Sequence, residues 1–394
     1  MTGVSERLEE LRDRGLYRRL RLIEGPQGPT VTLDGRQVLL LCSNNYLGLA
    51  DRAEVREAAA EAAMRWGAGS GASRLISGNM EPHRRLEARL AAFKGYEAAL
   101  LFGSGYLANT GVIAALAGRG EVVFSDELNH ASIVDGCRLS RAETFVYRHR
   151  DPEHLAWGLR TAQGRAALIV TDGVFSMDGD VAPLPELLEL ARRHGARLMV
   201  DEAHATGAVG PGGRGSVAAA GLGGEVDVVV GTLGKALGSY GAYVCAGAET
   251  VDLLVNTARP FVFSTAPPPP AVGSALAALA ILETEPELVD RLQSNAALLR
   301  RSLSAAGLEV GASTTQVVPV RVGEAEAAME LCELALEKGV FAQGIRPPTV
   351  PEGSCRLRLT AMATHRPEDL VAAAHMVGVA ARETGLVGAQ PLAA

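Results

Sequence analysis

From about residue 50 to residue 282, short and almost continuously apolar segments alternate with stretches of helical periodicity such as 184–194. Strands without a polar face are buried on both sides, and helical connections between them are typical of parallel pairing. We therefore predict an α/β fold whose mostly parallel sheet is covered by helices on both faces. Functional side chains should gather at the carboxyl ends of its strands. The predicted strands are 98–102, 121–124, 167–170, 197–200 and 226–230.

The N-terminal region precedes this alternation and has a pattern of its own. Residues 5–22 are rich in arginine and carry leucines near one face, which predicts an amphipathic helix. Residues 30–33 and 38–41 lie on either side of an Asp34-Gly35 turn and predict a short strand pair.

The C-terminal region has a third pattern. The prolines within 266–270 are expected to stop regular structure before a long helix at about 271–283. Beyond that helix, strand-like segments at 317–322 and 356–359, together with two helices, indicate a smaller α+β domain. The predicted division is 1–48 for an N-terminal helix with short strands, 49–282 for a large domain and 283–394 for a small C-terminal domain.

Composition and charge exclude several classes of function. The net charge is -7 and no basic block occurs, which argues against a nucleic-acid partner. No apolar run reaches 18 residues and the charged N-terminus has no signal-peptide core, so we expect a cytoplasmic protein without a membrane partner. The five cysteines form no CxxC pair and are interpreted as reduced packing residues. The eight histidines suggest no metal site.

Lysine is rare in this chain, because only three of its 38 basic residues are lysines. Lys94 and Lys338 each end a helical pattern just before a glycine, where a cation complements the helix dipole. Lys235 instead follows a buried strand and the glycine-containing turn 231–234. Because a neutral lysine can form a Schiff base and arginine cannot, Lys235 is the predicted covalent amine.

A carboxylate, Asp201, ends another predicted strand, one strand-helix-strand unit before Lys235. Burying a carboxylate is costly unless a cation meets it, and a protonated pyridine nitrogen is such a partner. This pairing is what pyridoxal phosphate needs, since the lysine carries the aldehyde and the aspartate keeps the ring nitrogen protonated. The plain alternative is a helix-capping aspartate and a surface lysine.

Further polar residues follow predicted strands. His204, three residues after Asp201, could bond the cofactor's phenolic oxygen, and His130 could stack on its ring; either could instead be a packed structural histidine. The amides of Gly105 and Tyr106 open a helix after a strand and suit a phosphate, to which Thr232 could add a hydroxyl. Ser176 follows a fourth strand.

Several long motifs in this order resemble the α-oxoamine synthases, pyridoxal phosphate enzymes of the aspartate aminotransferase fold. The resemblance covers essentially the whole chain and implies fold type I, with a seven-stranded, mostly parallel sheet in the large domain and a smaller α+β C-terminal domain. It also implies a homodimer with active sites at the subunit interface. The motifs occupy 42–49, 69–74, 125–136, 171–180, 201–216 and 231–238.

Within this group, the segments 345–351 and 356–360 look like those of the biotin-pathway member, which condenses L-alanine with a pimeloyl thioester and releases carbon dioxide. The acyl carrier, coenzyme A in pimeloyl-CoA or acyl carrier protein, stays open. Residues 125–136 and 231–238 are also similar to 2-amino-3-ketobutyrate CoA ligase, which uses glycine and acetyl-CoA. An aminotransferase or decarboxylase, or a non-enzymatic protein of this fold, remains a further alternative.

The resemblance also implies a role for individual residues. The implied catalytic set is Lys235 for the Schiff base, Asp201 for the ring nitrogen, His204 for the phenolate and His130 stacked on the ring. The implied cofactor contacts are completed by Ser176 and by the phosphate ligands Gly105, Tyr106, Thr232 and, toward the neighbouring subunit, Thr265. Arg358 would bind the amino-acid carboxylate with Asn44 nearby. Arg21, or one of its neighbours Arg18 and Arg19, and Thr349 would contact substrate, as would His130.

Overall fold

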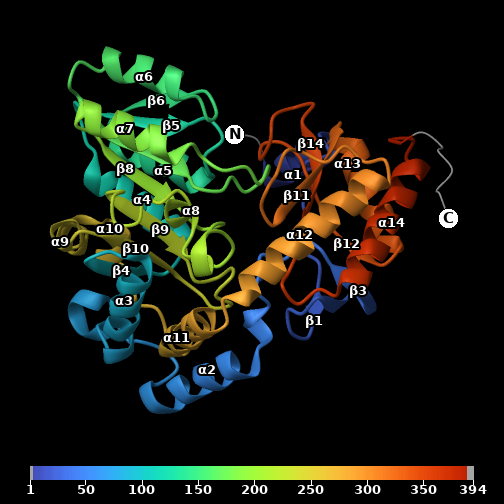
Figure 1. The fold of residues 1–394 in the computed structure, drawn as a ribbon, viewed down its shortest axis with the longest axis horizontal. Coiled ribbons are helices and arrows are strands. Elements are labelled where there is room, and N and C mark those ends of the chain that lie inside the picture. The colour runs from blue at the N-terminus through green and yellow to red at the C-terminus, as the bar shows by residue number, and fades with distance from the viewer. Residues whose placement is uncertain (1–2, 388–394) are drawn as a thin grey trace. The chain divides into compact units, whose positions relative to one another are not determined.

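The computed structural model describes residues 3–387 and divides the chain into two compact units (Figure 1). The large unit contains residues 49–176 and 180–290. The small unit contains residues 1–48, 177–179 and 291–394, so the N-terminal segment groups with the C-terminal region.

The large unit is built on a seven-stranded sheet with the order β4-β10-β9-β8-β7-β5-β6. Only β10 runs antiparallel to its neighbours, β4 and β9, while the other adjacent pairs are parallel. This confirms the predicted α/β class with a mostly parallel sheet. The strands are β4 (Ala98–Phe102), β5 (Val122–Asp126), β6 (Glu143–Tyr147), β7 (Ala166–Asp172), β8 (Arg197–Asp201), β9 (Val228–Thr232) and β10 (Ala242–Ala246).

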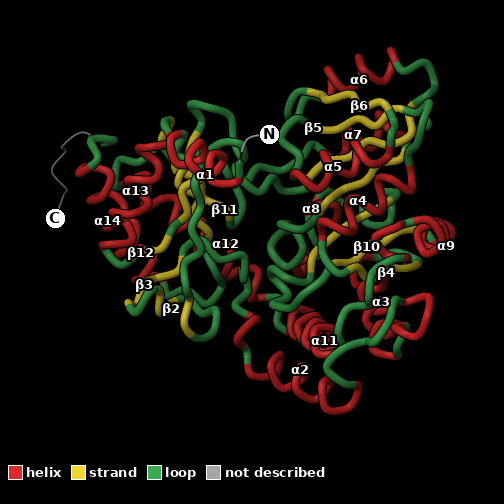
Figure 2. Tube along the Cα trace, turned by 180° about the vertical axis from the view of Figure 1, so that it is seen from behind, coloured by secondary structure: helices red, strands yellow, loops and turns green. Residues whose placement is uncertain are grey.

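Helices cover this sheet on both faces, as the red helices on either side of the yellow strands in Figure 2 show. One face packs against α4 (Gly105–Leu116), α5 (Ala131–Ser140), α9 (Ala248–Thr257) and α10 (Arg259–Val262). The other packs against α6 (Pro152–Thr161), α7 (Leu184–His194) and α8 (Ser216–Ala219). The unit also contains η1 (Leu49–Asp51), α2 (Ala53–Trp66), η2 (Arg74–Gly78), α3 (Glu81–Lys94), η3 (Pro211–Gly213) and α11 (Pro269–Thr284).

Sequence reasoning missed two of the seven strands, for different reasons. The edge strand β6 has the sequence ETFVY and is mostly exposed, so it lacks the continuous apolar run that marked the others. The strand β10 has the sequence AYVCA, and its alanines give a weak strand signal although every residue is buried.

The small unit combines two small sheets with helices. One sheet has the order β1-β2-β3-β12 and the other, antiparallel, has the order β11-β14-β13. The predicted strand pair and the two predicted C-terminal strands are all present. The strands are β1 (Ile23–Glu24), β2 (Thr30–Leu33), β3 (Arg36–Leu40), β11 (Val317–Gly323), β12 (Val340–Phe341), β13 (Gln343–Ile345) and β14 (Cys355–Thr360). The helices are α1 (Val4–Asp13), α12 (Glu287–Ala305), whose first turn falls in the large unit, α13 (Ala325–Glu337) and α14 (Pro367–Glu383).

The predicted helix over 5–22 is wrong in its second half, because α1 ends at Asp13. Gly15 then adopts a left-handed conformation with φ of 63°, and residues 16–22 are not helical. Glycine takes this conformation without steric cost, which is why it often ends a helix. The leucine spacing continues beyond Gly15, although the helix has already ended there.

The proline-rich run also acts differently from the prediction. The helix α11 begins at Pro269, so two of the prolines form its first turn rather than preceding it. Proline is tolerated there because the first amides of a helix have no carbonyl partner one turn earlier. The run therefore marks the start of the helix.

Within residues 3–387, no helix is both long and apolar enough to cross a membrane. All five cysteines are free thiols, and Cys137, Cys245, Cys332 and Cys355 are buried, in keeping with a packing role.

Candidate active site

The ends of three adjacent strands bring together the acidic and basic residues of the large unit. In the parallel pairing of β7 with β8, Asp172 lies directly beside Asp201. In the pairing of β8 with β9, Asp201 lies beside Val230, two residues before Thr232 ends its strand. The predicted gathering at the carboxyl edge of the sheet is therefore present.

Asp201 is 4% exposed, and both of its carboxylate oxygens accept hydrogen bonds. Oδ2 accepts from the side-chain amide of Asn109 on α4 at 2.6 Å, and Oδ1 accepts from the Ala203 amide at 2.8 Å. These bonds hold the carboxylate in a fixed orientation, as a buried polar group requires. Asn109 itself is 1% exposed and also donates to Ser132 at 2.8 Å.

Lys235 and His204 meet in the turn regions that follow β9 and β8. The Lys235 Nζ and the His204 Nε2 are 2.8 Å apart. His204 is buried, whereas Lys235 is partly exposed. The lysine turn is closed by a bond from the Gly238 amide to the Lys235 carbonyl at 2.9 Å. Gly238 has φ of 57°, and a Cβ there would lie 2.4 Å from the Ala50 nitrogen, so this turn requires glycine.

His130 caps the first turn of α5, and its Nδ1 accepts from the Ser132 amide at 3.3 Å. Its own amide donates to the Asp172 Oδ2 at 2.8 Å. Desolvation is the main cause that lowers the pKa of His130, with Lys235 acting in the same direction and Asp201 opposing both. A neutral imidazole can stack on a cofactor ring and still has one N–H that can donate a hydrogen bond to an oxyanion.

Asp172 is buried at 2% exposure beside a second carboxyl group. Burial, and next the nearby charge of Asp201, raise its pKa well above the usual range. Burial beside a second carboxyl group therefore favours the protonated form of Asp172. Its backbone amide donates to the Asn129 side chain at 2.8 Å.

The predicted phosphate ligands lie at the start of α4. Ser104 is the N-cap, and its hydroxyl accepts from the Leu107 amide at 3.2 Å. The amides of Gly105 and Tyr106 begin the helix, where they have no carbonyl one turn earlier. The Thr232 hydroxyl donates to the Gly241 carbonyl at 3.1 Å and accepts from the Gly234 amide at 3.2 Å, so it also shapes the lysine turn.

The other two predicted cofactor residues of the large unit lie in loops. Ser176 is partly exposed and directly precedes the segment 177–179. The amide of the preceding residue, Phe175, donates to the Asp180 carbonyl. Thr265 is exposed and forms an isolated antiparallel bridge with Ser73.

The small unit places two of its predicted substrate residues together. Arg358 on β14 is 6% exposed and donates to the Asn44 side-chain oxygen at 3.3 Å. The hydroxyl of the buried Tyr46 donates to the same oxygen at 3.1 Å. Burial is the main cause that raises the pKa of Tyr46, and the Arg358 guanidinium opposes that rise.

The remaining substrate candidates are engaged differently. Arg21 forms an ion pair with Glu333 and lies 3.8 Å from Asp34, and the Glu333 hydrogen bond raises the Arg21 pKa. Thr349 is exposed, and its amide bonds to the Arg346 carbonyl at 3.1 Å. Arg18 and Arg19 are exposed, and Arg18 is close enough to lower the pKa of Arg346, for which burial is the larger cause.

Sequence reasoning missed two residues that organise this site. Asn109 sits inside α4, where a buried amide was not suspected, and only its polarity within an apolar helix could have signalled a role. Asp172 ends a buried strand in the same way as Asp201. Its position after an apolar strand could therefore have identified it as a candidate site residue.

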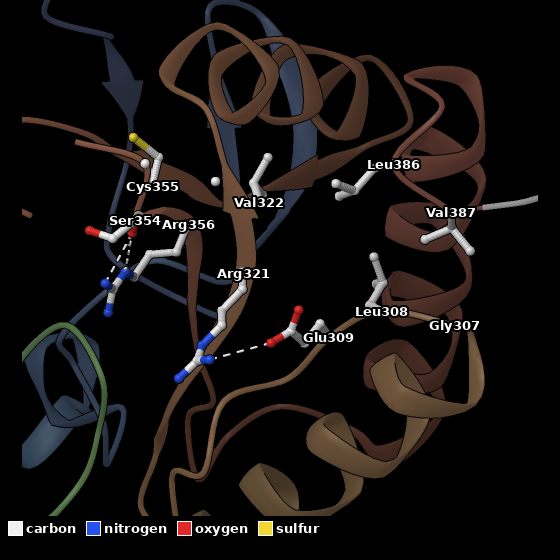
Figure 3. Close-up of a pocket in the computed structure, with 12 residues that line it drawn as sticks. Gly307, Leu308, Glu309, Arg321, Val322, Ser354, Cys355, Arg356, Leu386 and Val387 are labelled. Carbon is white, nitrogen blue, oxygen red and sulfur yellow. Dashed lines mark hydrogen bonds and ion pairs between the residues drawn. The ribbon is translucent and has the colours of Figure 1, made fainter. Parts of the chain in front are cut away.

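A cavity of about 490 Å³ in the small unit lies apart from the predicted residues (Figure 3). Figure 3 shows Arg321 pointing toward Glu309, 3.4 Å away, and Arg356 turned toward the Ser354 carbonyl. None of the predicted site residues lines this cavity, so its size alone does not make it the candidate site.

The arrangement in the large unit fits pyridoxal phosphate. An amine sits beside an imidazole, a buried carboxylate is held with both oxygens bonded, and a helix begins with two amides available for a phosphate. These are the groups that the aldehyde, the ring nitrogen and the phosphate of this cofactor require. Fold and residues together define a pyridoxal phosphate enzyme of fold type I.

Comparison with known proteins agrees with this class. Residues 36–377 match the family described as "Aminotransferase class I and II", and the chain belongs to that family. The chain is 54% identical to an 8-amino-7-oxononanoate synthase of Citrifermentans bemidjiense, over 98% of this chain and 100% of the relative. It is 55% identical to the enzyme of the same name from Geobacter sulfurreducens, over 98% and 99% of the two chains.

Solved structures extend the comparison. A serine palmitoyltransferase from S. paucimobilis with a bound PLP–myriocin aldimine matches with a TM-score of 0.92 and 34% identity, over 98% of each chain. An 8-amino-7-oxononanoate synthase from Francisella tularensis matches with a TM-score of 0.76 and 26% identity, over 88% of this chain and 98% of the other. The predicted family, fold type and pyridoxal phosphate cofactor are confirmed by these findings.

Proposed function

We propose that this chain catalyses the decarboxylative condensation of L-alanine with a pimeloyl thioester to give 8-amino-7-oxononanoate, carbon dioxide and a free thiol carrier. The observation that carries the proposal is the contact between Lys235 and His204, next to the oriented carboxylate of Asp201. The choice of substrates is supported by relatives at 53–55% identity that bear the name of this synthase.

Each residue has a defined task in the proposed reaction. Bound pyridoxal phosphate supplies an electron sink that stabilises negative charge at the amino-acid Cα. Lys235 would hold the cofactor covalently through its Nζ, and the same amine would accept the α-proton of alanine. Asp201 keeps a proton on the pyridine nitrogen, and His204 holds the phenolic oxygen. Gly105, Tyr106, Thr232 and Ser176 hold the rest of the cofactor.

The acyl-transfer part needs groups that bind charge. His130 donates a hydrogen bond to the thioester oxygen, where negative charge develops as the new carbon–carbon bond forms and the thiol leaves. Arg358, oriented by Asn44, pairs with the alanine carboxylate before that group is lost as carbon dioxide. Arg21, or one of its neighbours Arg18 and Arg19, contacts substrate together with Thr349.

The proposal includes a homodimer, in which Thr265 reaches the partner's phosphate site. Large apolar side chains are exposed around the bridge between Ser73 and Thr265, namely Leu75 at 51%, Ile76 at 81% and Phe263 at 70%. Such a patch on a folded protein marks an interaction surface, and a second copy of this chain would cover it. Sedimentation of the purified enzyme tests this part.

A second candidate is another α-oxoamine synthase reaction, because the serine palmitoyltransferase structure matches with the higher TM-score of the two structures compared. The deciding experiment measures thiol release and product mass with L-alanine and pimeloyl-CoA, with L-serine and palmitoyl-CoA, and with glycine and acetyl-CoA. We expect turnover with the first pair and at most traces with the others. Preference for serine or glycine would replace the proposed reaction, and a parallel assay with pimeloyl-acyl carrier protein identifies the carrier.

A further inference from the structure

The side chain of Lys94 is buried in the large unit, although its position in the sequence indicated a helix-terminal surface cation. The helix α3 ends at Lys94, and Gly95 follows with φ of 77°. The lysine side chain is only 2% exposed and forms an ion pair with Glu202, which is fully buried. The ammonium also donates to the Thr206 hydroxyl at 3.2 Å and to the Arg214 carbonyl at 2.6 Å. Three acceptors match its three hydrogens.

The Glu202 carboxylate is satisfied just as completely. One oxygen accepts from Lys94, and the other accepts from the Ser216 hydroxyl at 2.9 Å and the Val217 amide at 2.7 Å. Its backbone is also held, because its amide donates to the Val230 carbonyl at 2.7 Å. Glu202 is therefore fixed at both its main chain and its side chain.

Space for this network depends on one glycine. Gly215 has φ of 100°, and a Cβ at this position would lie 2.1 Å from the Glu202 Oε2. Any other residue would push the carboxylate away from Lys94. The loop that provides the Arg214 carbonyl and the Ser216 hydroxyl is thus shaped to receive this ion pair.

The ion pair is directly connected to residues of the cofactor site through the main chain. Glu202 directly follows Asp201, the last residue of β8, and its amide still bonds to β9, so the alternation of side chains between the two faces of the sheet continues to Glu202. Asp201 accordingly bonds to Asn109 on one face, while Glu202 bonds to Lys94 on the other. The Glu202 carbonyl also accepts from the Ala205 and Thr206 amides at 3.0 and 2.9 Å, which closes the turn that carries His204.

We propose that Lys94 and Glu202 are positioning residues for the pyridoxal phosphate site. Their ion pair locks the turn from Glu202 to Thr206, and so fixes where Asp201 meets the ring nitrogen and where His204 meets Lys235. A buried ion pair is weak evidence for stability alone, because its desolvation cost can offset its attraction. Precise support of the residues that touch a cofactor is the better explanation for such a fully satisfied pair.

The test uses Lys94→Met, Glu202→Gln and the double variant. Each single change leaves one buried charge without its partner and should lower stability, whereas the double variant removes both charges and should unfold near the wild-type temperature. Three quantities are measured: the unfolding midpoint without cofactor, the dissociation constant of pyridoxal phosphate, and the pH midpoint of the visible absorbance of the loaded enzyme. Arg89→Met is the control, since Arg89 lies on the same helix but pairs with Glu283 on α11.

We expect the double variant to bind pyridoxal phosphate about tenfold more weakly and to show a shifted absorbance midpoint, although its unfolding midpoint is restored. Wild-type affinity and an unshifted midpoint in the double variant would overturn the proposal and leave a purely structural pair. If the double variant does not fold, Ser216→Ala removes only one donor to Glu202. It should weaken cofactor binding in the same direction, and no change in affinity or absorbance midpoint would again overturn the proposal.

This inference depends on the cofactor but not on the proposed substrates. All three measurements are made without alanine or acyl donor, so a wrong assignment of the substrates would leave them unaffected. Conversely, a failed positioning role would leave the proposed condensation intact.

Discussion

The large and small units orient buried charges in two different ways. In the large unit, Asp172 and Asp201 stand at the ends of adjacent parallel strands, and Lys235 follows the end of the next strand. In the small unit, Arg356 and Arg358 stand on one face of β14, the central strand of an antiparallel sheet. Leu357 and Leu359 alternate with them and pack into the core.

The difference determines how far each site can be recognised in a sequence. A residue directly after an apolar strand is placed by the fold itself, because parallel strands end at one edge. An arginine within an antiparallel strand takes its role from partners that the sequence separates widely. Arg358 bonds to Asn44, and Arg356 forms an ion pair with Asp178. Such pairings follow from register and tertiary packing, which local patterns do not encode.

The largest expected effect belongs to the strand-end lysine of the large unit. We expect Lys235→Ala to lower turnover by more than about a thousandfold and to abolish the covalent link to the cofactor, because no other amine there can replace it. Borohydride reduction followed by peptide mass spectrometry locates the link in the wild type. The matched control is Lys338→Ala in the small unit, where Nζ pairs with the exposed Glu383 at 2.9 Å. Turnover that survives in Lys235→Ala, or a link found at Lys338, would contradict the assignment.

The same contrast explains how much of the fold was predictable. Five of the seven strands in the large sheet were found because each is a continuous apolar run. The edge strand β6 was missed because one of its faces is open to solvent, and β10 was missed because its alanines give a weak strand signal. The N-terminal helix was extended past Gly15, since leucine spacing alone cannot show that the backbone has turned left-handed.

The candidate site was predictable to a similar degree. Lys235, Asp201 and His204 were predicted from their positions after strands, and the structure brings Lys235 and His204 into contact. The contacts of Asn109 with Asp201 and of Lys94 with Glu202 were not predicted, because both residues come from helices far away in sequence. Lys94 was correctly predicted to lie at the end of a helix. Its side chain was expected at the surface, but it is buried and forms an ion pair with Glu202.

One histidine in each unit should make stability depend on pH, and the two dependences should have opposite signs. The first is His149 in the large unit. Its ring lies 2.9 Å from Asp126 and 2.7 Å from Asp180, with Arg150 also on Asp180 and the Phe175 ring against its edge. Burial lowers the pKa of His149, but the hydrogen bonds and charges of the two aspartates outweigh this effect and raise the pKa to about 9. Because this pKa exceeds the unfolded value of about 6.5, the stabilisation is complete below pH 6.5 and is lost as the pH rises through 9.

The stabilisation from protonated His149 is about 3 kcal/mol at most. Urea unfolding of the wild type and of His149→Asn at pH 6, 7.5 and 9.5 measures it. The difference in unfolding free energy between the two proteins should shrink as the pH rises, because the asparagine cannot titrate. A difference that is constant over this range would mean that the two aspartates do not hold a charged imidazole.

His365 in the small unit should show the opposite sign. It is 4% exposed, its Nδ1 accepts from the Met362 amide at 2.9 Å, and its Nε2 lies 3.1 Å from the Leu40 carbonyl. Burial is the main cause that lowers its pKa to about 4. The unfolded state therefore binds the proton more readily, and stability should fall by up to about 3 kcal/mol as the pH drops from 6.5 to 4. Unfolding of His365→Asn at pH 7 and pH 4.5 checks this, and an equal acid loss in the variant would assign the effect to other groups.

The smallest effect distinguishes the two arginines of β14. Arg358→Lys should raise the KM for alanine about tenfold, because a lysine cannot bind a carboxylate through two parallel hydrogen bonds. Cofactor affinity should not change, since the residues proposed to hold pyridoxal phosphate all belong to the large unit. Steady-state kinetics and a cofactor titration separate these two quantities.

Arg356→Lys is the matched control, with the same substitution on the same face of the same strand. Arg356 already pairs with Asp178 and donates to the Ser354 carbonyl at 3.1 Å, so its loss should affect stability rather than the KM for alanine. If both variants raise this KM equally, the effect comes from the sheet as a whole and not from a carboxylate contact. If only Arg358→Lys raises the KM for alanine, Arg358 has a role as specific as that of Lys235. Its position within an antiparallel strand made this role much harder to predict from the sequence.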